Sequence, residues 1–225
     1  MPLKAPAKKI SNEIIAGYMT AELGSLTQRA LQHENALANK INFFLVAVTT
    51  VGGGLTLASG NPFLQKDILP LSIALALIFH VMGWITLSQG LDLRAGSTIF
   101  YRRMGRIRQW FLDHEASLAP YLPFEPGDNR PLFYVAYAPI RSIESILLLV
   151  NSLTAGAVAS LVWLFAYFQV LQPKTSQTSS LLITLIVGAL VAVLIWSLQL
   201  RYIRRFMFSR EKWETDHGRV HFKFD

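Results

Sequence analysis

The residues with the clearest metal-binding spacing are two histidines near the end of the sequence. His217 and His221 are four residues apart, and two imidazoles at this spacing on one helix could bind a metal ion. Gly218 lies between them, and apolar and polar residues alternate through "GRVHFKFD" (218–225), a pattern that is typical of a strand. We therefore predict no metal site here.

A second candidate for chemistry is His80, the only ionisable side chain well inside an apolar stretch. Ionisable residues inside membrane spans are often functional, and a proton relay is one interpretation. The other, which we favour, is a neutral imidazole that hydrogen-bonds to a neighbouring helix. No Asp or Glu lies near the middle of an apolar stretch, so the sequence does not favour a proton-coupled transporter.

Catalytic constellations are scarce in this chain. The sequence has no cysteine and shows no Ser-His-Asp arrangement, phosphate-binding loop or dinucleotide fingerprint. Only Arg141, Glu144 and His114 offer polar side chains that could converge at a membrane surface. We therefore predict neither a catalytic residue nor a cofactor.

Four arginines gather in "FYRRMGRIRQWF" (100–111), namely Arg102, Arg103, Arg106 and Arg108. Ser97 is a plausible N-cap for a helix whose apolar face consists of Phe100, Met104, Ile107, Phe111 and Leu118. An amphipathic helix with basic flanks next to an anionic leaflet should lie along the headgroups or pack on the other cytoplasmic elements, and we assign the four arginines to contacts with lipid headgroups. The stretch lacks an RNA-binding signature, and we predict no nucleic-acid partner.

The elements that position these residues have the composition of a membrane protein. Hydrophobic residues make up 52% of the chain and charged residues 16%, against about 25% in soluble domains. Four stretches are long and apolar enough to span a bilayer: 41–59, 68–89, 145–168 and 181–200. The expected fold is an all-α integral membrane protein, with four transmembrane helices and a small cytoplasmic layer of amphipathic helices.

Basic residues predict how these spans are oriented. Five lie before the first span, seven between the second and third, and seven after the fourth, whereas each short loop has one, Lys66 or Lys174. By the positive-inside rule, both termini and the central segment face the cytoplasm of an inner or plasma membrane. The chain then divides into a cytoplasmic helix (1–40), a transmembrane hairpin (41–89), a basic and proline-rich segment (90–144), a second hairpin (145–200) and a basic tail (201–225).

Two further segments have readable patterns. Before the first span, apolar residues follow helical spacing from a plausible Ser11 cap directly into the span: Ile15, Met19, Leu23, Leu26, Ala30, Leu37 and Ile41. This pattern predicts one helix that continues the span and packs against a partner through its apolar stripe. Between 119 and 140, five prolines exclude a regular helix. Within this stretch, "LFYVAYA" (132–138) predicts either a short strand or an extended segment that covers the cytoplasmic ends of the spans.

Small residues form a stripe in the third span. Ser152, Gly156 and Ser160 are spaced by four, with Asn151 beside them, and Gly188 and Ala192 repeat the pattern in the fourth span. Such stripes let helix backbones approach closely in lipid. The stripe packs either within one four-helix bundle, which we favour, or between copies of the chain.

The leading functional hypothesis is a non-enzymatic, oligomerising membrane protein that acts as a scaffold, effector or pore through its cytoplasmic layer. The expected partners are a bilayer with anionic headgroups, further copies of the chain and a cytoplasmic protein. The alternative is a channel or transporter for a small solute, with His80 and Asn151 lining the route. A membrane-embedded enzyme is the third hypothesis.

Overall fold

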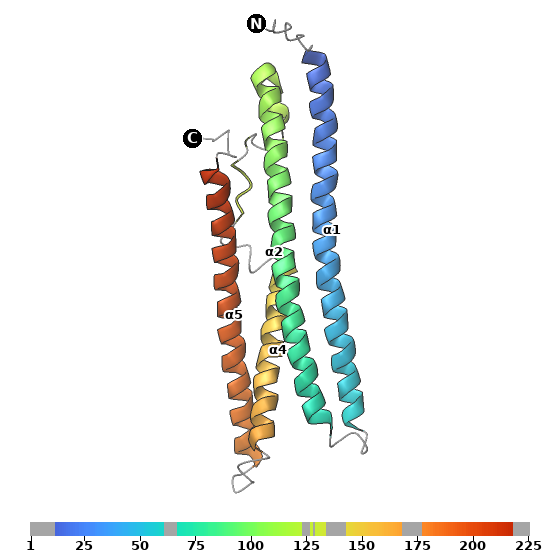
Figure 1. Ribbon diagram of the computed structural model, residues 1–225, viewed down its shortest axis with the longest axis vertical. Coiled ribbons are helices and arrows are strands. Elements are labelled where there is room, and N and C mark those ends of the chain that lie inside the picture. Colours follow the sequence, from blue (N-terminus) through green and yellow to red (C-terminus); the bar gives the residue numbers. More distant parts are fainter. Residues whose placement is uncertain are drawn as a thin grey trace, which may run out of the picture.

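The computed structural model describes residues 12–60, 67–122, 127, 129–133, 143–167 and 177–217, and these are helical or irregular, with no strand among them. Four long helices run nearly parallel or antiparallel to one another (Figure 1): α1 (Asn12–Ser59), α2 (Ile68–His114), α4 (Ile143–Ala166) and α5 (Gln177–Asp216). A short 3-10 helix, η1 (Ala116–Tyr121), follows α2. The expectation of an all-α fold is confirmed for this part of the chain, whereas most of the predicted strand at 132–138 and all of "GRVHFKFD" lie outside it.

Each of the four long helices contains a segment long and apolar enough to cross a membrane. Such a crossing needs about 20 residues, and α1, α2 and α5 are twice that length. At one end they extend beyond α4 (Figure 1), and their residues there lie outside the predicted spans. We call this projection the stalk: residues 12–40 of α1, 90–114 of α2 and 201–216 of α5.

The helices form an open bundle in which α2 is central. It packs along α1 on one side and along α4 on the other, and α4 in turn packs along α5. Contacts between α1 and α4 and between α2 and α5 are few. The outer helices, α1 and α5, therefore keep a large part of their apolar surface uncovered, with Leu57 of α1 83% exposed.

The predicted helix before the first span is confirmed, because α1 runs unbroken from Asn12 through the span. Its apolar stripe is already occupied within the chain. Leu26 and Ala30 are buried in a cluster with Met104 and Ile107 of α2, and Leu37 and Ile41 join the larger core nearer the spans. The partner of this stripe, where it is buried, is thus α2.

The predicted helix start at Ser97 is wrong. Ser97 is buried in the middle of α2, and its hydroxyl donates a hydrogen bond to the carbonyl of Leu93 at 3.2 Å. A serine hydroxyl can cap a helix or bond back to the carbonyl four residues earlier, so its presence does not by itself mark a helix start. The seven residues before it, "GLDLRAG", contain no proline to break the helix.

Candidate functional site

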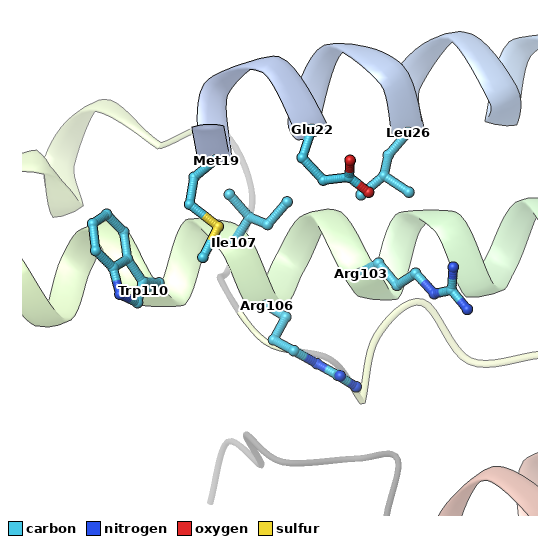
Figure 2. A pocket seen from close by; sticks show the side chains of 7 residues that line it. All are labelled: Met19, Glu22, Leu26, Arg103, Arg106, Ile107 and Trp110. Carbon is cyan, nitrogen blue, oxygen red and sulfur yellow. The ribbon is translucent and has the colours of Figure 1, made fainter. Parts of the chain in front are cut away.

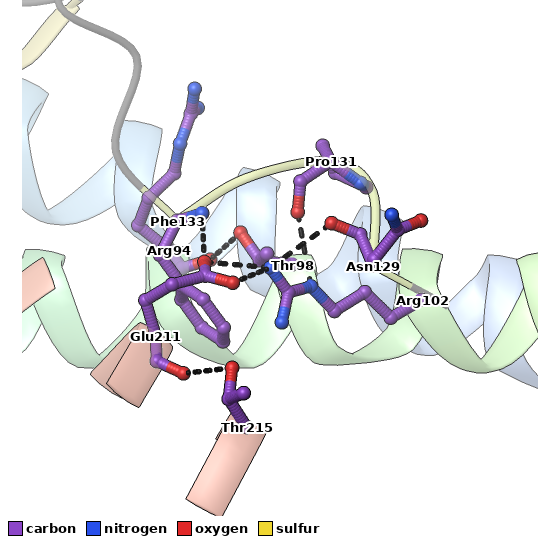
Figure 3. Close-up of polar contacts among 8 residues, drawn as sticks. All are labelled: Arg94, Thr98, Arg102, Asn129, Pro131, Phe133, Glu211 and Thr215. Atoms are coloured by element: carbon purple, nitrogen blue, oxygen red, sulfur yellow. Dashed lines mark hydrogen bonds and ion pairs between the residues drawn. The ribbon is translucent and has the colours of Figure 1, made fainter. Parts of the chain in front are cut away.

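Arg102 lies at the centre of a polar junction in the stalk (Figure 3). Its Nη2 donates to both carboxylate oxygens of Glu211 on α5, at 2.8 and 2.7 Å. Its Nε donates to the carbonyl of Pro131 at 3.0 Å, and its guanidinium lies 4.5 Å from the centre of the Phe133 ring. The junction ties together α2, α5 and the segment 129–133.

Two further contacts lie beside this junction, one to the segment 129–133 and one to Gly127. The Phe133 amide donates to Glu211 Oε2 at 3.2 Å, so one carboxylate binds both α2 and the segment. Gly105, one turn beyond Arg102, lies against the backbone of Gly127, and a Cβ there would collide with the Gly127 carbonyl. The glycine is therefore required for the close approach of this loop to α2.

The Arg102 side chain is only 5% exposed, so little of it is accessible for the contact with lipid headgroups that the sequence led us to expect. The other three arginines of the cluster are far from the predicted spans because α2 continues straight into the stalk. Arg103 and Arg108 are 14 and 19 residues beyond Gln89, which is about 21 and 29 Å at 1.5 Å per residue. Physiological salt screens charges beyond about 8 Å, so this geometry does not favour lipid contact for them.

A different set of arginines lies close to the expected lipid surface. Arg201, Arg204 and Arg205 of α5 are exposed, and they follow the end of the predicted fourth span within five residues, about 8 Å. Sequence reasoning counted them only as part of a basic tail. The signal that identifies them is their distance along a helix that continues from the span.

A belt of polar contacts marks the level at which the stalk begins. Lys40 Nζ donates to Gln89 Oε1 at 2.6 Å at this level. Arg210, ten residues beyond the predicted fourth span, lies 3.3 Å from Asp92 of α2, so this pair joins the belt to the stalk part of α5. Glu144, at the start of α4, lies 3.9 Å from Arg94 of α2. Arg141, which we considered together with Glu144 at the membrane surface, lies outside the described residues.

A buried polar layer lies between the predicted spans. His80 Nδ1 is 3.2 Å from the backbone carbonyl of Asn151, which places the histidine in hydrogen-bonding contact with α4. Asn151 is 0% exposed, and both polar atoms of its amide lack a hydrogen-bond partner among the described residues. Next to it, Ser152 Oγ lies 3.4 Å from Oε1 of the buried Gln199, a residue that sequence reasoning did not single out.

The small-residue stripe of α4 faces α5 of the same chain. A Cβ on Gly156 would lie 2.6 Å from the carbonyl oxygen of Gly188 and 3.1 Å from Cβ of Ala192. Ser160 Oγ donates to the carbonyl of Thr184 at 3.0 Å across the same contact. The backbones approach closely here within one chain, so this stripe is not available as a seam between copies.

Two of the residues considered for catalysis, His114 and Glu144, lie far apart. His114 is at the far tip of α2, where its Nδ1 lies 2.8 Å from the Trp110 carbonyl. Glu144 contacts Arg94, which is 20 residues, or about 30 Å, earlier on α2. No group of three metal-ligating side chains occurs within the described ranges, and His221 is outside them.

A hydrogen bond between a tyrosine and a carboxylate joins α1 and α2 within the stalk. The hydroxyl of Tyr101 donates to Glu34 Oε1 at 2.8 Å. Partial burial, and then the hydrogen bond to the Glu34 carboxylate, raise the pKa of Tyr101 above its ordinary value. At neutral pH the phenol is therefore protonated and holds the two helices together.

Comparison with family models, curated proteins and solved structures finds no match for this chain.

Proposed function

We propose that the chain is a non-enzymatic membrane protein that assembles with itself and acts as a scaffold through a cytoplasmic stalk. The observation that carries the proposal is the continuity of α1, α2 and α5 from apolar segments into the stalk, where Arg102 and Glu211 join α2 to α5. A scaffold must hold its working surface at a fixed distance and angle from the membrane. Unbroken helices joined by an ion pair whose arginine is buried meet that need.

The charge distribution supports a cytoplasmic position for the stalk. Most basic residues lie in the segments at the stalk end, whereas the short loops at the other end have one each. The exposed arginines Arg201, Arg204 and Arg205 lie where an anionic inner leaflet would attract them. We therefore place both termini in the cytoplasm of an inner or plasma membrane.

The open bundle supports self-assembly. The outer helix α1 packs mainly on α2, and Phe43, Val46 and Leu57 remain largely exposed along its predicted span. At Gly52, Gly53 and Gly54 a Cβ would meet nothing within 4 Å, so packing inside the chain does not require these glycines. Small residues on a membrane-facing helix permit another helix to approach closely.

Subunit counting in a membrane tests this proposal. The full-length protein, fused to a fluorescent label, is reconstituted at low density into lipid bilayers and its bleaching steps are counted. We expect complexes with two or more copies. A single bleaching step for almost every particle, after correction for incomplete labelling, would contradict self-assembly.

A channel or transporter is the second candidate, and the polar layer of His80, Asn151, Ser152 and Gln199 is the observation that favours it. Buried amide groups without partners are costly in lipid, and a water or a small solute would satisfy them. The four described long helices form an open row, with few contacts between α1 and α4 or between α2 and α5, and do not close a ring around a central path. This arrangement makes the scaffold the better-supported function. Solute flux into liposomes that contain the purified protein, compared with empty liposomes, distinguishes the two functions.

A further inference from the structure

Near the tip of the stalk, α1 and α2 form a groove with a volume of about 590 Å³ (Figure 2). Met19, Glu22 and Leu26 line it from α1, and Arg103, Arg106, Ile107 and Trp110 line it from α2. Leu26 and Ile107 are buried, so they form an apolar floor, while Met19 and Trp110 remain partly exposed. The acidic and basic side chains lie on different helices: Glu22 is on α1, and Arg103 and Arg106 are on α2.

The acid and the bases lie at the same height above the predicted spans. The hydrogen bond from Lys40 to Gln89 sets a common level for the antiparallel helices. Glu22 is 18 residues from Lys40, and Arg106 is 17 residues from Gln89, which is about 27 and 26 Å along the helices. Figure 2 shows Glu22 between Arg103 and Arg106 along the helix axis.

The partly exposed apolar residues of the groove also lie at one height above the predicted spans. Met19 and Trp110 are each 21 residues from the reference pair, about 32 Å along their helices. The groove thus has an apolar level nearest the tip and a charged level below it. Each level contains one contribution from α1 and at least one from α2.

Membrane insertion restricts how two copies of such a surface can meet. Copies with the same orientation in one bilayer are related by rotation about the membrane normal, and such a rotation preserves height. In a two-fold contact the same patch is used by both subunits, so residue i of one copy faces residue j of the other, and the reverse also holds. Glu22 of each copy would then face Arg103 and Arg106 of the other, at matching height.

We propose that this groove binds the same groove of a second copy, giving a two-fold contact between stalks with two sets of Glu22–arginine pairs around apolar residues. The inference rests on the proposed self-assembly and names the surface that carries it in the stalk. An acidic peptide is a poorer occupant because it would be attracted by the arginines but would meet the carboxylate of Glu22 on the opposite rim. Matching charges of both signs favour a surface that also contains both signs.

Charge reversal tests the proposal with the full-length protein in detergent or nanodiscs. Glu22→Arg leaves only bases in the groove, and Arg103→Glu with Arg106→Glu leaves only acids, so each variant repels itself. We expect the dissociation constant of each variant alone to rise about tenfold or more, because like charges that face each other at an interface are strongly unfavourable. When the two variants are mixed, every acid faces a base again, and we expect heterodimers with an affinity close to that of the native protein.

Controls separate this result from unfolding. Glu13→Arg reverses a charge at an exposed position nine residues from Glu22, on the opposite side of α1, and should leave assembly unchanged. Circular dichroism and thermal unfolding check that each variant is folded. If the double variant unfolds, Arg103→Glu alone, at an exposed side chain, replaces it.

The outcomes distinguish this inference from the proposed function. A native protein that is monomeric in the bilayer contradicts both. Native assembly that neither charge variant weakens, or a mixture that assembles no better than each variant alone, overturns the groove contact and leaves self-assembly standing. Loss of assembly with the arginine variant but not with Glu22→Arg would also overturn it, because that result indicates an acidic partner.

Discussion

The carboxylate of Glu211 accepts two hydrogen bonds from the guanidinium of Arg102, although the two residues are 109 positions apart in the chain. The arginine side chain is almost fully buried, whereas that of the glutamate is 29% exposed. This difference decides which partner is more costly to remove. A buried charge without its counter-ion is strongly destabilising, and a partly exposed one is hydrated by water.

The first prediction concerns this pair. Glu211→Ala leaves the guanidinium of Arg102 buried without its carboxylate and should lower the free energy of unfolding by about 3 kcal/mol. Arg102→Met removes the buried charge and retains an apolar side chain of similar length, so it should cost less. Lys212→Ala, at the next and exposed position of α5, is the control. Equal thermal stability of Glu211→Ala and Lys212→Ala in detergent would show that the junction contributes little.

The second prediction concerns the α4–α5 contact. Gly156→Leu places a branched side chain against the Gly188 carbonyl, which lies 2.6 Å from where the Cβ would be, and should separate the helices. We expect a loss of several degrees in melting temperature. Ala157→Leu adds similar bulk at the adjacent, exposed position and should have little effect. Equal melting temperatures for the two variants would contradict the assigned packing.

The difference between these two sites shows what the sequence could and could not reveal. The stripe of Gly156 and Ser160 repeats every four residues, and this local pattern indicates a helix contact wherever it occurs. The role of Arg102 depends on Glu211 and on the backbone of Pro131, and no spacing along the chain connects them. In the sequence, Arg102 is one of four arginines in a short stretch, and this local pattern is typical of exposed charges.

The extent of α2 was also beyond local reasoning. A membrane span followed by an amphipathic segment suggests two helices with a bend between them, and Ser97 has a residue type suited to the second start. Nothing in residues 90–96 breaks the helix, so the two segments join. This one difference moves Arg103 and Arg108 from the expected lipid surface to positions about 21 and 29 Å away.

The third prediction follows from this change of position. Replacing Arg201, Arg204 and Arg205 by glutamine should weaken the preference of the protein for anionic lipid, by up to about 1 kcal/mol for each residue. Replacing Arg103 and Arg108 by glutamine should leave that preference unchanged. Native mass spectrometry of bound phosphatidylglycerol measures both. A larger loss from the α2 substitutions would return lipid contact to the stalk arginines.

The fourth prediction concerns pH and the contact of Tyr101 with Glu34. Because the folded pKa of this tyrosine is raised, its contribution to stability is fully present below the unfolded value of 10.0 and is lost as pH rises through the folded pKa. At pH 7, Tyr101→Phe should cost about 1 kcal/mol, the usual contribution of one hydrogen bond.

Chemical unfolding at a series of pH values measures this difference. The advantage of the native protein over Tyr101→Phe should shrink steadily above pH 10. Tyr18→Phe, at an exposed tyrosine of α1, should differ little from the native protein at any pH. A Tyr101 advantage that persists unchanged at high pH would show that its hydroxyl does not carry the contact.

Four spans with a cytoplasmic stalk fix the side of the membrane on which each loop and tail lies, and cysteine accessibility in intact cells measures that side. The chain has no cysteine, so each introduced thiol gives the only signal. Cysteines at Lys66 and Lys174 should react with an impermeant thiol reagent, whereas those at Lys8 and Lys212 should react only after the cells are opened. Labelling of Lys8 and Lys212 in intact cells, with protection of Lys66 and Lys174, would contradict the orientation on which the stalk's proposed role depends.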